Sequence, residues 1–92
     1  MSPKAKNVEQ RRQVQRVQTG LRVERRLLKV MKGLAEYHDI TLGDLVEGVV
    51  LHVFEGKAPL GKDSLQVVDR LRKVYGLDLV AADSHRLREA AE

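Results

Sequence analysis

The sequence predicts a mainly helical protein in which one short strand precedes the helices. Over residues 17–23, apolar and polar residues alternate, which is the pattern of a strand with one buried face. Two runs of apolar residues at helical spacing follow, over residues 24–38 and 41–56, and a third covers residues 63–75. We therefore expect one strand, two core helices and one or two further helices toward the C-terminus.

The predicted strand needs a partner from outside the chain, because no other segment has a comparable alternating pattern. A lone strand leaves backbone donors and acceptors unpaired on both edges, so we expect it to pair with the same strand of a second subunit. A chain of 92 residues with 3% aromatic residues also has little bulk for a monomeric core, which favours a homodimer. The predicted dimer core contains Val17, Leu21, Val23, Leu45, Val49 and Val53.

The two core helices have recognisable ends. We expect the first helix to begin at Glu24 or a neighbour and to end near His38. Thr41 is a suitable N-cap for the second helix, with Asp44 three residues later, and Gly56 ends that helix. The second helix has a wide apolar stripe, formed by Leu42, Leu45, Val46, Val49, Val50, Val53 and Phe54. A stripe of this width predicts contacts with more than one neighbour.

Gly48 lies inside the second helix, where glycine costs up to about 1 kcal/mol relative to alanine. Two interpretations stay open. Gly48 allows another helix backbone to approach closely, as where the second helices of a dimer cross, or it has no packing role.

The C-terminal part is predicted to add helical structure. Asp63 or Ser64 can cap a third helix that stops at Gly76, and residues 77–92 are expected to form a short fourth helix. The third helix presents Leu65, Val68, Leu71 and Tyr75 on one face. The chain thus divides into a basic flexible arm (1–13), a strand and two-helix module (14–56) and a helical extension (57–92).

The charge of the chain is uneven. Residues 1–33 carry ten Lys and Arg against two Glu, whereas residues 34–92 carry seven basic and eleven acidic side chains. This asymmetry indicates that the N-terminal part faces a polyanion, with a solvated basic tail as the alternative. There is no cysteine, the apolar runs are too short for a bilayer, and residues 1–16 do not resemble a signal peptide. We expect a cytoplasmic protein without a membrane partner.

The order of elements in residues 17–56 resembles the ribbon-helix-helix family of DNA-binding proteins, the Arc, MetJ and CopG type. The resemblance rests on Leu21, Arg22, Val23, Glu24, Arg25, Arg26, Leu27 and Leu28, then Leu34, Ala35 and Glu36, then Ile40 and Thr41, and the stripe from Leu45 to Phe54. In that family, the strands of two subunits pair antiparallel and enter the major groove. The resemblance implies a transcriptional regulator, most simply a repressor, that is associated with the bacterial nucleoid.

The resemblance also assigns DNA-contacting residues. Gln18, Gly20 and Arg22 would face the bases, where Gln18 can recognise adenine and Arg22 guanine, each for about 1–3 kcal/mol of discrimination. Gly20 departs from the family pattern, which generally has a polar side chain there. Phosphate contacts are implied for Thr41, Leu42 and Gly43 at the start of the second helix, and for Arg11, Arg12, Arg16, Arg25 and Arg26. Asp44 opposes an anion at that helix start, and Arg25 and Arg26 also suit an ordinary solvated helix face.

Other function classes have less support in the sequence. We expect no enzyme, no cofactor and no metal site, because His38, His52 and His85 lie in separate segments and no nucleophile or phosphate-loop motif occurs. The main alternative is an antitoxin, whose residues 57–92 would bind a partner protein instead of packing on the dimer. A nonspecific DNA- or RNA-binding protein is a further alternative, although the basic region lacks aromatic residues for base stacking. The operator, and any association of dimers along DNA, do not follow from the sequence.

Overall fold

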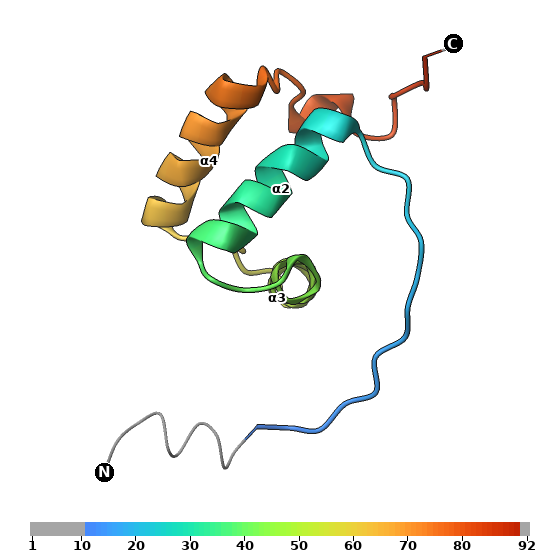
Figure 1. Ribbon diagram of the computed structural model, residues 1–92, viewed down its shortest axis with the longest axis vertical. Coiled ribbons are helices and arrows are strands. Elements are labelled where there is room, and N and C mark those ends of the chain that lie inside the picture. The colour runs from blue at the N-terminus through green and yellow to red at the C-terminus, as the bar shows by residue number, and fades with distance from the viewer. Residues whose placement is uncertain (1–10, 91–92) are drawn as a thin grey trace.

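The computed structural model describes residues 11–90, and within them the folded part consists of three helices (Figure 1). Helix α2 covers Arg25–Tyr37, α3 covers Leu42–Phe54 and α4 covers Lys62–Tyr75, followed by the short 3-10 helix η1 at Ala81–Asp83. The prediction of a mainly helical protein is therefore confirmed. None of the helices in the described part of the chain is long and apolar enough to span a membrane.

Residues 11–24 form neither a strand nor a helix, and they run as an extended segment past the helices (Figure 1). The predicted strand over residues 17–23 is thus not formed in the single chain. The physical reason is that a strand requires a second extended backbone as its hydrogen-bonding partner, and no strand occurs elsewhere in residues 11–90. Of the predicted basic arm, residues 11–13 are exposed and irregular, and residues 1–10 lie outside the described residues.

Helix α2 begins and ends where the sequence predicts. The Glu24 side chain accepts a hydrogen bond from the backbone N–H of Leu27 at 2.9 Å, which caps the first turn. His38 closes the last turn, and Asp39 then takes a left-handed conformation with φ of 57°. Asp tolerates this region better than most residues do, so the chain can turn sharply into α3.

The start of α3 is also confirmed. The Thr41 hydroxyl accepts a hydrogen bond from the backbone N–H of Asp44 at 3.0 Å. The helix ends at Phe54, and Gly56 follows with φ of 70°, a conformation that glycine adopts without steric cost.

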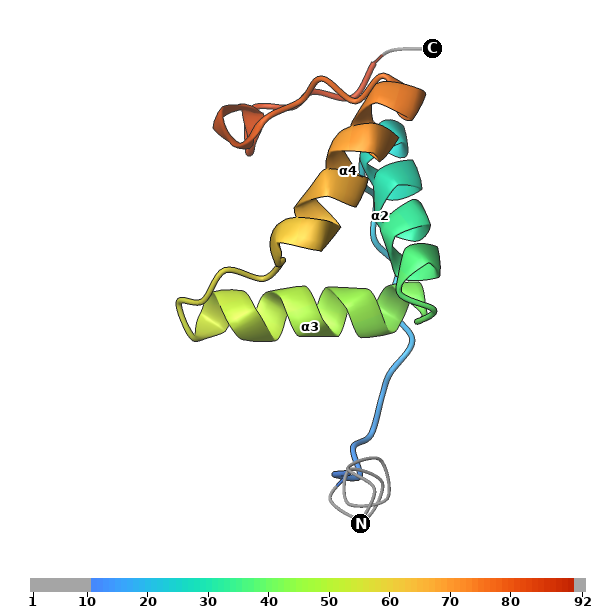
Figure 2. The same ribbon diagram turned by 90° about the vertical axis from the view of Figure 1, so that its left-hand side faces the viewer.

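Helix α2 is the centre of the fold. Helix α4 lies beside it, and α3 runs across one end of this pair (Figure 2). The core where they meet contains the buried Leu34 and Ala35 of α2 and Leu45 of α3. The half-buried residues packed against it are Met31, Leu42, Val49, Leu60, Val67, Val68 and Leu71. Since α2 supplies most of the buried residues, it holds α3 and α4 in place.

Gly33 allows α4 to pack closely on α2. A Cβ atom at this position would lie 2.9 Å and 3.0 Å from the two methyl carbons of Leu71. These distances are well below van der Waals contact, so any larger side chain would force Leu71 or the whole helix to move. Gly48 was singled out from the sequence and Gly33 was not, although both are glycines in the middle of a predicted helix.

Two details of α4 differ from the prediction. The helix begins at Lys62 with Gly61 as its N-cap, so neither Asp63 nor Ser64 is the cap. Asp63 instead lies in the first turn, where its charge suits the positive end of the helix, and Ser64 is buried. Leu65 is 54% exposed, because the packed face starts at Ser64 and continues through Val67, Val68 and Leu71. Because this face begins with a polar residue, Ser64, the apolar pattern placed its start one residue too late, at Leu65.

The predicted end of α4 at Gly76 is confirmed, but the predicted fourth helix is wrong. Gly76 has φ of 65° and ends α4 in the left-handed conformation. Beyond it, residues 77–90 form only the single turn η1, whose Asp83 carboxylate accepts the backbone N–H of Val80 at 2.8 Å. Apolar residues are too sparse here to bury a helix face, although Leu77 itself is buried. Residues 91 and 92 lie outside the described residues.

Candidate nucleic-acid interface

The three residues predicted to face DNA bases lie together on the extended segment. Gln18, Gly20 and Arg22 are all exposed, and a Cβ atom on Gly20 would meet nothing within 4 Å. They occupy alternate positions of an extended backbone, so their side chains can share one side of it. The single chain therefore leaves this row of positions accessible.

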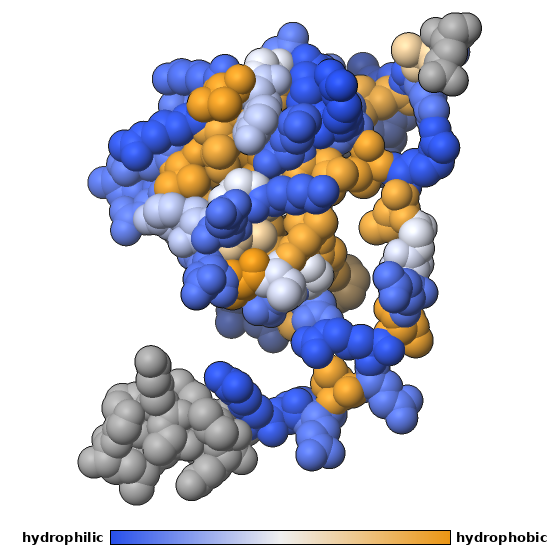
Figure 3. All heavy atoms as spheres, in the orientation of Figure 1, coloured by the Kyte–Doolittle hydropathy of each residue, from blue (hydrophilic) through white to orange (hydrophobic). Residues whose placement is uncertain are grey.

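The opposite side of the same segment carries exposed apolar residues. Val17 is 86% exposed and Leu21 is 77% exposed, so the chain itself buries little of either side chain. In Figure 3, apolar residues of this segment lie open on the face in view. Val23, closer to α2, is exposed to a smaller extent. Large apolar side chains in an alternating row normally cover a hydrophobic surface, and here that surface is not supplied by the chain itself.

Helix α3 has a similarly uncovered face. Val53 is 55% exposed and Phe54 is 79% exposed, and Val50 beside them is also exposed. Of the two predicted dimer-core residues nearer the start of α3, Leu45 is buried in the chain's own core and Val49 packs against that core. The wide apolar stripe is thus divided between the core of the single chain and a face that the single chain leaves open.

Gly48 is not part of that open face. At about 100° per residue, it lies on the opposite side of α3 from Val46 and Val50. A Cβ atom at Gly48 would meet nothing within 4 Å. His52, one turn further on, donates a hydrogen bond from Nδ1 to the Gly48 carbonyl oxygen at 2.6 Å. The contacts within the chain give no reason for glycine at this position.

The first turn of α3 faces the basic segment across an open groove. The groove is lined by Arg11, Arg12, Gln13, Val14, Gln15, Arg16 and Val17 on one side, and by Thr41, Gly43, Asp44 and Glu47 on the other. Leu42 and Gly43 are the first two residues of the helix, whose backbone N–H groups have no acceptor within the helix. The structure thus brings the predicted phosphate contacts Arg11, Arg12 and Arg16 near the predicted helix start, together with two carboxylates.

Arg16 and Glu47 form a two-pronged ion pair across this groove. Arg16 Nε lies 2.8 Å from Glu47 Oε2, and Arg16 Nη2 lies 2.9 Å from Glu47 Oε1. The hydrogen bond and the charge of Arg16 lower the pKa of Glu47, and the same contacts raise the pKa of Arg16. Both groups are therefore charged at neutral pH.

The Arg26 side chain forms hydrogen bonds within the folded part of the chain. Its Nη1 donates to the Gly76 carbonyl oxygen at 2.9 Å and to Asp78 Oδ1 at 3.1 Å, and its Nε donates to Glu24 Oε2 at 3.1 Å. Glu24 above all raises the pKa of Arg26. These bonds tie the start of α2 to the chain that follows α4, which is a structural role. Arg25, its neighbour, is exposed.

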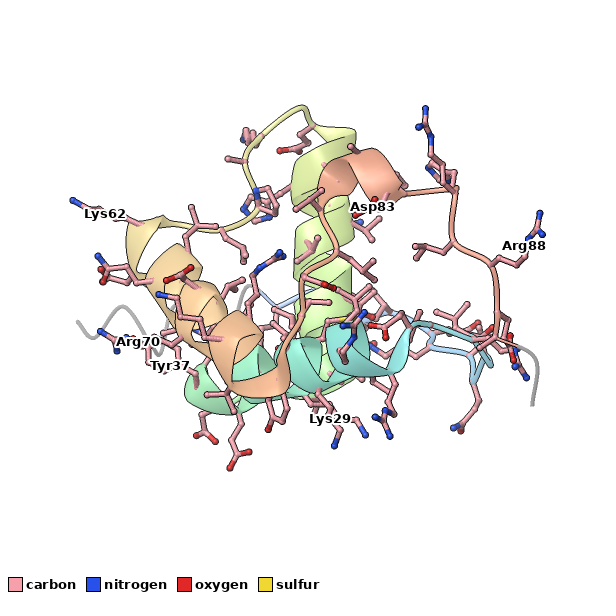
Figure 4. All side chains as sticks on the ribbon, turned by 90° about the horizontal axis from the view of Figure 1, so that it is seen from above. Lys29, Tyr37, Lys62, Arg70, Asp83 and Arg88 are labelled. Carbon is pink, nitrogen blue, oxygen red and sulfur yellow. The ribbon has the colours of Figure 1, made fainter. Side chains whose placement is uncertain are left out.

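Further charged residues surround the extended segment. Arg22 pairs with Glu89, which belongs to the tail after η1. Residues of this tail, including Leu87 and Arg88, line a second groove together with residues 21–26. In Figure 4, the Arg88 side chain projects outward from the tail. Lys29, on the outer side of α2, lies 5.6 Å from the centre of the Tyr75 ring, a cation–π distance that joins α2 to α4.

The histidines have local partners. His38 Nε2 and Ser64 Oγ share a hydrogen bond of 2.8 Å, which joins the end of α2 to the start of α4 and satisfies the buried hydroxyl. His52 bonds its own helix. Within residues 11–90, no three His, Asp or Glu side chains are grouped so that they could hold a metal ion.

The acidic residues that contact the basic segment were not predicted from the sequence. Glu47 is 31 residues from Arg16 and Glu89 is 67 residues from Arg22, so only the tertiary structure brings these pairs together. Comparison of the chain with protein-family models, with curated protein sequences and with solved structures finds no significant match.

Proposed function

We propose that the chain forms a homodimer that binds double-stranded DNA and regulates transcription by occupying a promoter. Residues 17–23 of two copies would pair as an antiparallel ribbon and enter the major groove, as the ribbon-helix-helix resemblance implies. The fold needed for this arrangement comprises the extended segment, α2 and α3, and the chain's helices lie in that order.

One observation carries the proposal. The single chain exposes apolar side chains in two places at once, at Val17 and Leu21 of the extended segment and at Val53 and Phe54 of α3. Burial of such surface contributes roughly 25 cal/mol per Å² and is the main drive for association. Pairing of two extended segments would also satisfy the backbone groups that residues 17–23 leave without a strand partner. Contact with a second copy would bury the exposed apolar side chains and would also pair the backbone groups of residues 17–23.

The polar side of the ribbon would then face DNA. Gln18 and Arg22 have the donors and acceptors for bidentate contacts with adenine and guanine, and Gly20 lets the backbone approach the base edges. Arg11, Arg12, Arg16 and Arg25 would add contacts to phosphates that depend on salt but carry little sequence information. The first turn of α3, at Thr41, Leu42 and Gly43, would bind a flanking phosphate through its free backbone N–H groups.

The packing of α4 favours a regulator over an antitoxin. Val67, Val68 and Leu71 of α4 contact the core beside α2, and Leu71 is closely fitted against Gly33. An apolar stripe that is already used within the chain is not free to bind a partner protein. We therefore assign residues 62–75 a structural role in the proposed dimer.

The experiment that tests the proposal is selection of the purified protein against a pool of random DNA duplexes at about 150 mM salt, which suppresses purely electrostatic binding. We expect an enriched motif with two-fold symmetry or a repeated half-site, since two identical ribbons read two half-sites. Binding that enriches no motif and fades steeply with salt would contradict sequence-specific regulation and would indicate a nonspecific anchor.

A further inference from the structure

Two arginines of the extended segment, Arg16 and Arg22, are held by carboxylates of the same chain. Arg16 forms two bonds to Glu47 of α3, at 2.8 Å and 2.9 Å, and Arg22 pairs with Glu89 of the C-terminal tail. The two pairs hold a segment of otherwise exposed residues near the folded part of the chain. Together, Arg16–Glu47 and Arg22–Glu89 are referred to below as the two clasps.

The clasps occupy the donor atoms that DNA would need. A guanidinium binds a carboxylate and a phosphate with the same pair of parallel N–H donors. While Arg16 donates through Nε and Nη2 to Glu47, these two donors are not available to a phosphate. Arg22 donates to Glu89 through Nη2 alone, and Nη2 is one of the terminal nitrogens that a base-reading arginine uses for guanine.

The surroundings of each clasp also point to competition with DNA. Glu47 and Asp44 line the groove at the start of α3, where an anion would otherwise be favoured by the helix dipole. Glu89 and Leu87 lie with Leu21 and Arg22 around the second groove, so the tail lies beside part of the segment proposed to form the ribbon. The carboxylates of Glu47 and Glu89 therefore lie where the proposed complex has DNA.

We infer that Glu47 and Glu89 are internal competitors of DNA, which hold residues 11–24 on their own chain until a duplex displaces them. This inference rests on the proposed function. Both clasps are exposed, with side-chain exposures of 68% and 42% for Arg16 and Glu47, so solvent weakens them and DNA can displace them. A duplex, with its high charge density, outcompetes a single carboxylate, whereas an isolated small anion does not.

The test compares the binding of one duplex by the parent, Glu47→Gln, Glu89→Gln and the double variant, with Glu36→Gln as the control. Glu36 is an exposed residue of α2 that lines neither groove, and its substitution makes the same change in net charge. Loss of one exposed ion pair is expected to tighten binding about 2- to 5-fold per chain. A dimer has each clasp twice, so the factor becomes about 4- to 25-fold, beyond the effect of Glu36→Gln.

A second measurement reads the Arg16 clasp without DNA. Trypsin cleaves after arginines in accessible extended chain, so cleavage after Arg16 should be faster in Glu47→Gln than in the parent or in Glu36→Gln. Equal DNA affinity of Glu47→Gln, Glu89→Gln and Glu36→Gln, in a protein that does bind duplex, would overturn this inference alone. Absence of duplex binding by the parent and all variants would contradict the proposed function, and the inference with it.

Discussion

Arg22 combines the two requirements for reading a base in the proposed complex. It lies on the polar side of the extended segment, and its side chain is 82% exposed. Arg25, three residues later, begins α2 and is also exposed, but the proposal assigns it only to phosphate. The two residues therefore form a matched pair of the same chemical type.

We predict that Arg22→Ala loses about 1–3 kcal/mol of discrimination at a guanine position, because the bidentate contact is lost there. Arg25→Ala should weaken binding similarly for all duplexes and reduce the salt dependence. Measurement of the affinities for the selected duplex and for a duplex substituted at that position separates the two effects. If Arg22→Ala kept the parent's preference between them, Arg22 would not be a base-reading residue.

Gly33 and Gly48 allow a second comparison between single residues. Alanine is favoured over glycine inside a helix by about 1 kcal/mol, so Gly48→Ala, with open space around it, should stabilise the protein. At Gly33, the added methyl group would meet Leu71, and overpacking costs about 1–3 kcal/mol. We expect Gly33→Ala to be less stable than Gly48→Ala by about 1 kcal/mol or more in urea unfolding. Equal stabilisation by both substitutions would mean that the Leu71 side chain moves aside without cost, which would contradict the close fit between Gly33 and Leu71.

At the scale of elements, the start of α2 depends on one carboxylate. Glu24 accepts the backbone N–H of Leu27 and pairs with Arg26, and these bonds lower its pKa, the backbone bond most. A carboxyl group with a lowered pKa stabilises the fold above the ordinary range for glutamate, near pH 4.3. This stability is lost as the pH falls through the lowered pKa.

We therefore predict that the free energy of unfolding decreases on acidification from neutral pH to about pH 3, and that Glu24→Gln reduces this dependence. Gln keeps an oxygen that can accept the Leu27 N–H, but it has no charge to lose. Urea unfolding of both proteins at several pH values provides the measurement. An identical pH dependence in Glu24→Gln and the parent would show that the Glu24 cap does not contribute to acid sensitivity.

The elements also show what the sequence could and could not predict. The ends of α2 and α3 followed from Glu24, His38 and Thr41, because capping depends on residues close in sequence. The face of α4 was misplaced because Ser64, a polar residue, takes a buried position through its bond to His38, 26 residues away. The clasps at Arg16 and Arg22 depend on contacts between segments distant in the chain, which a local pattern does not reveal.

The whole molecule has a small core for its length. The buried apolar residues in the described part are Val30, Leu34, Ala35, Leu45 and Leu77, and large apolar side chains remain exposed on α3 and on the extended segment. The sequence predicted this imbalance from its low aromatic content and its unpaired strand. We propose that a second copy of the chain covers these exposed apolar faces and pairs with the extended segment as a strand.

The most direct test is the number of chains bound per selected duplex, measured by sedimentation equilibrium for the parent, Val53→Lys and His52→Lys. Val53 lies on the open apolar face, whereas His52, also exposed, lies on the side of α3 that carries Gly48, about 160° from both Val50 and Phe54. A lysine at Val53 would place a charge in the proposed interface, so that variant should be monomeric and lose tight DNA binding. We predict two chains per duplex for the parent and for His52→Lys. One chain per duplex for the parent, or an undiminished dimer of Val53→Lys, would contradict the account.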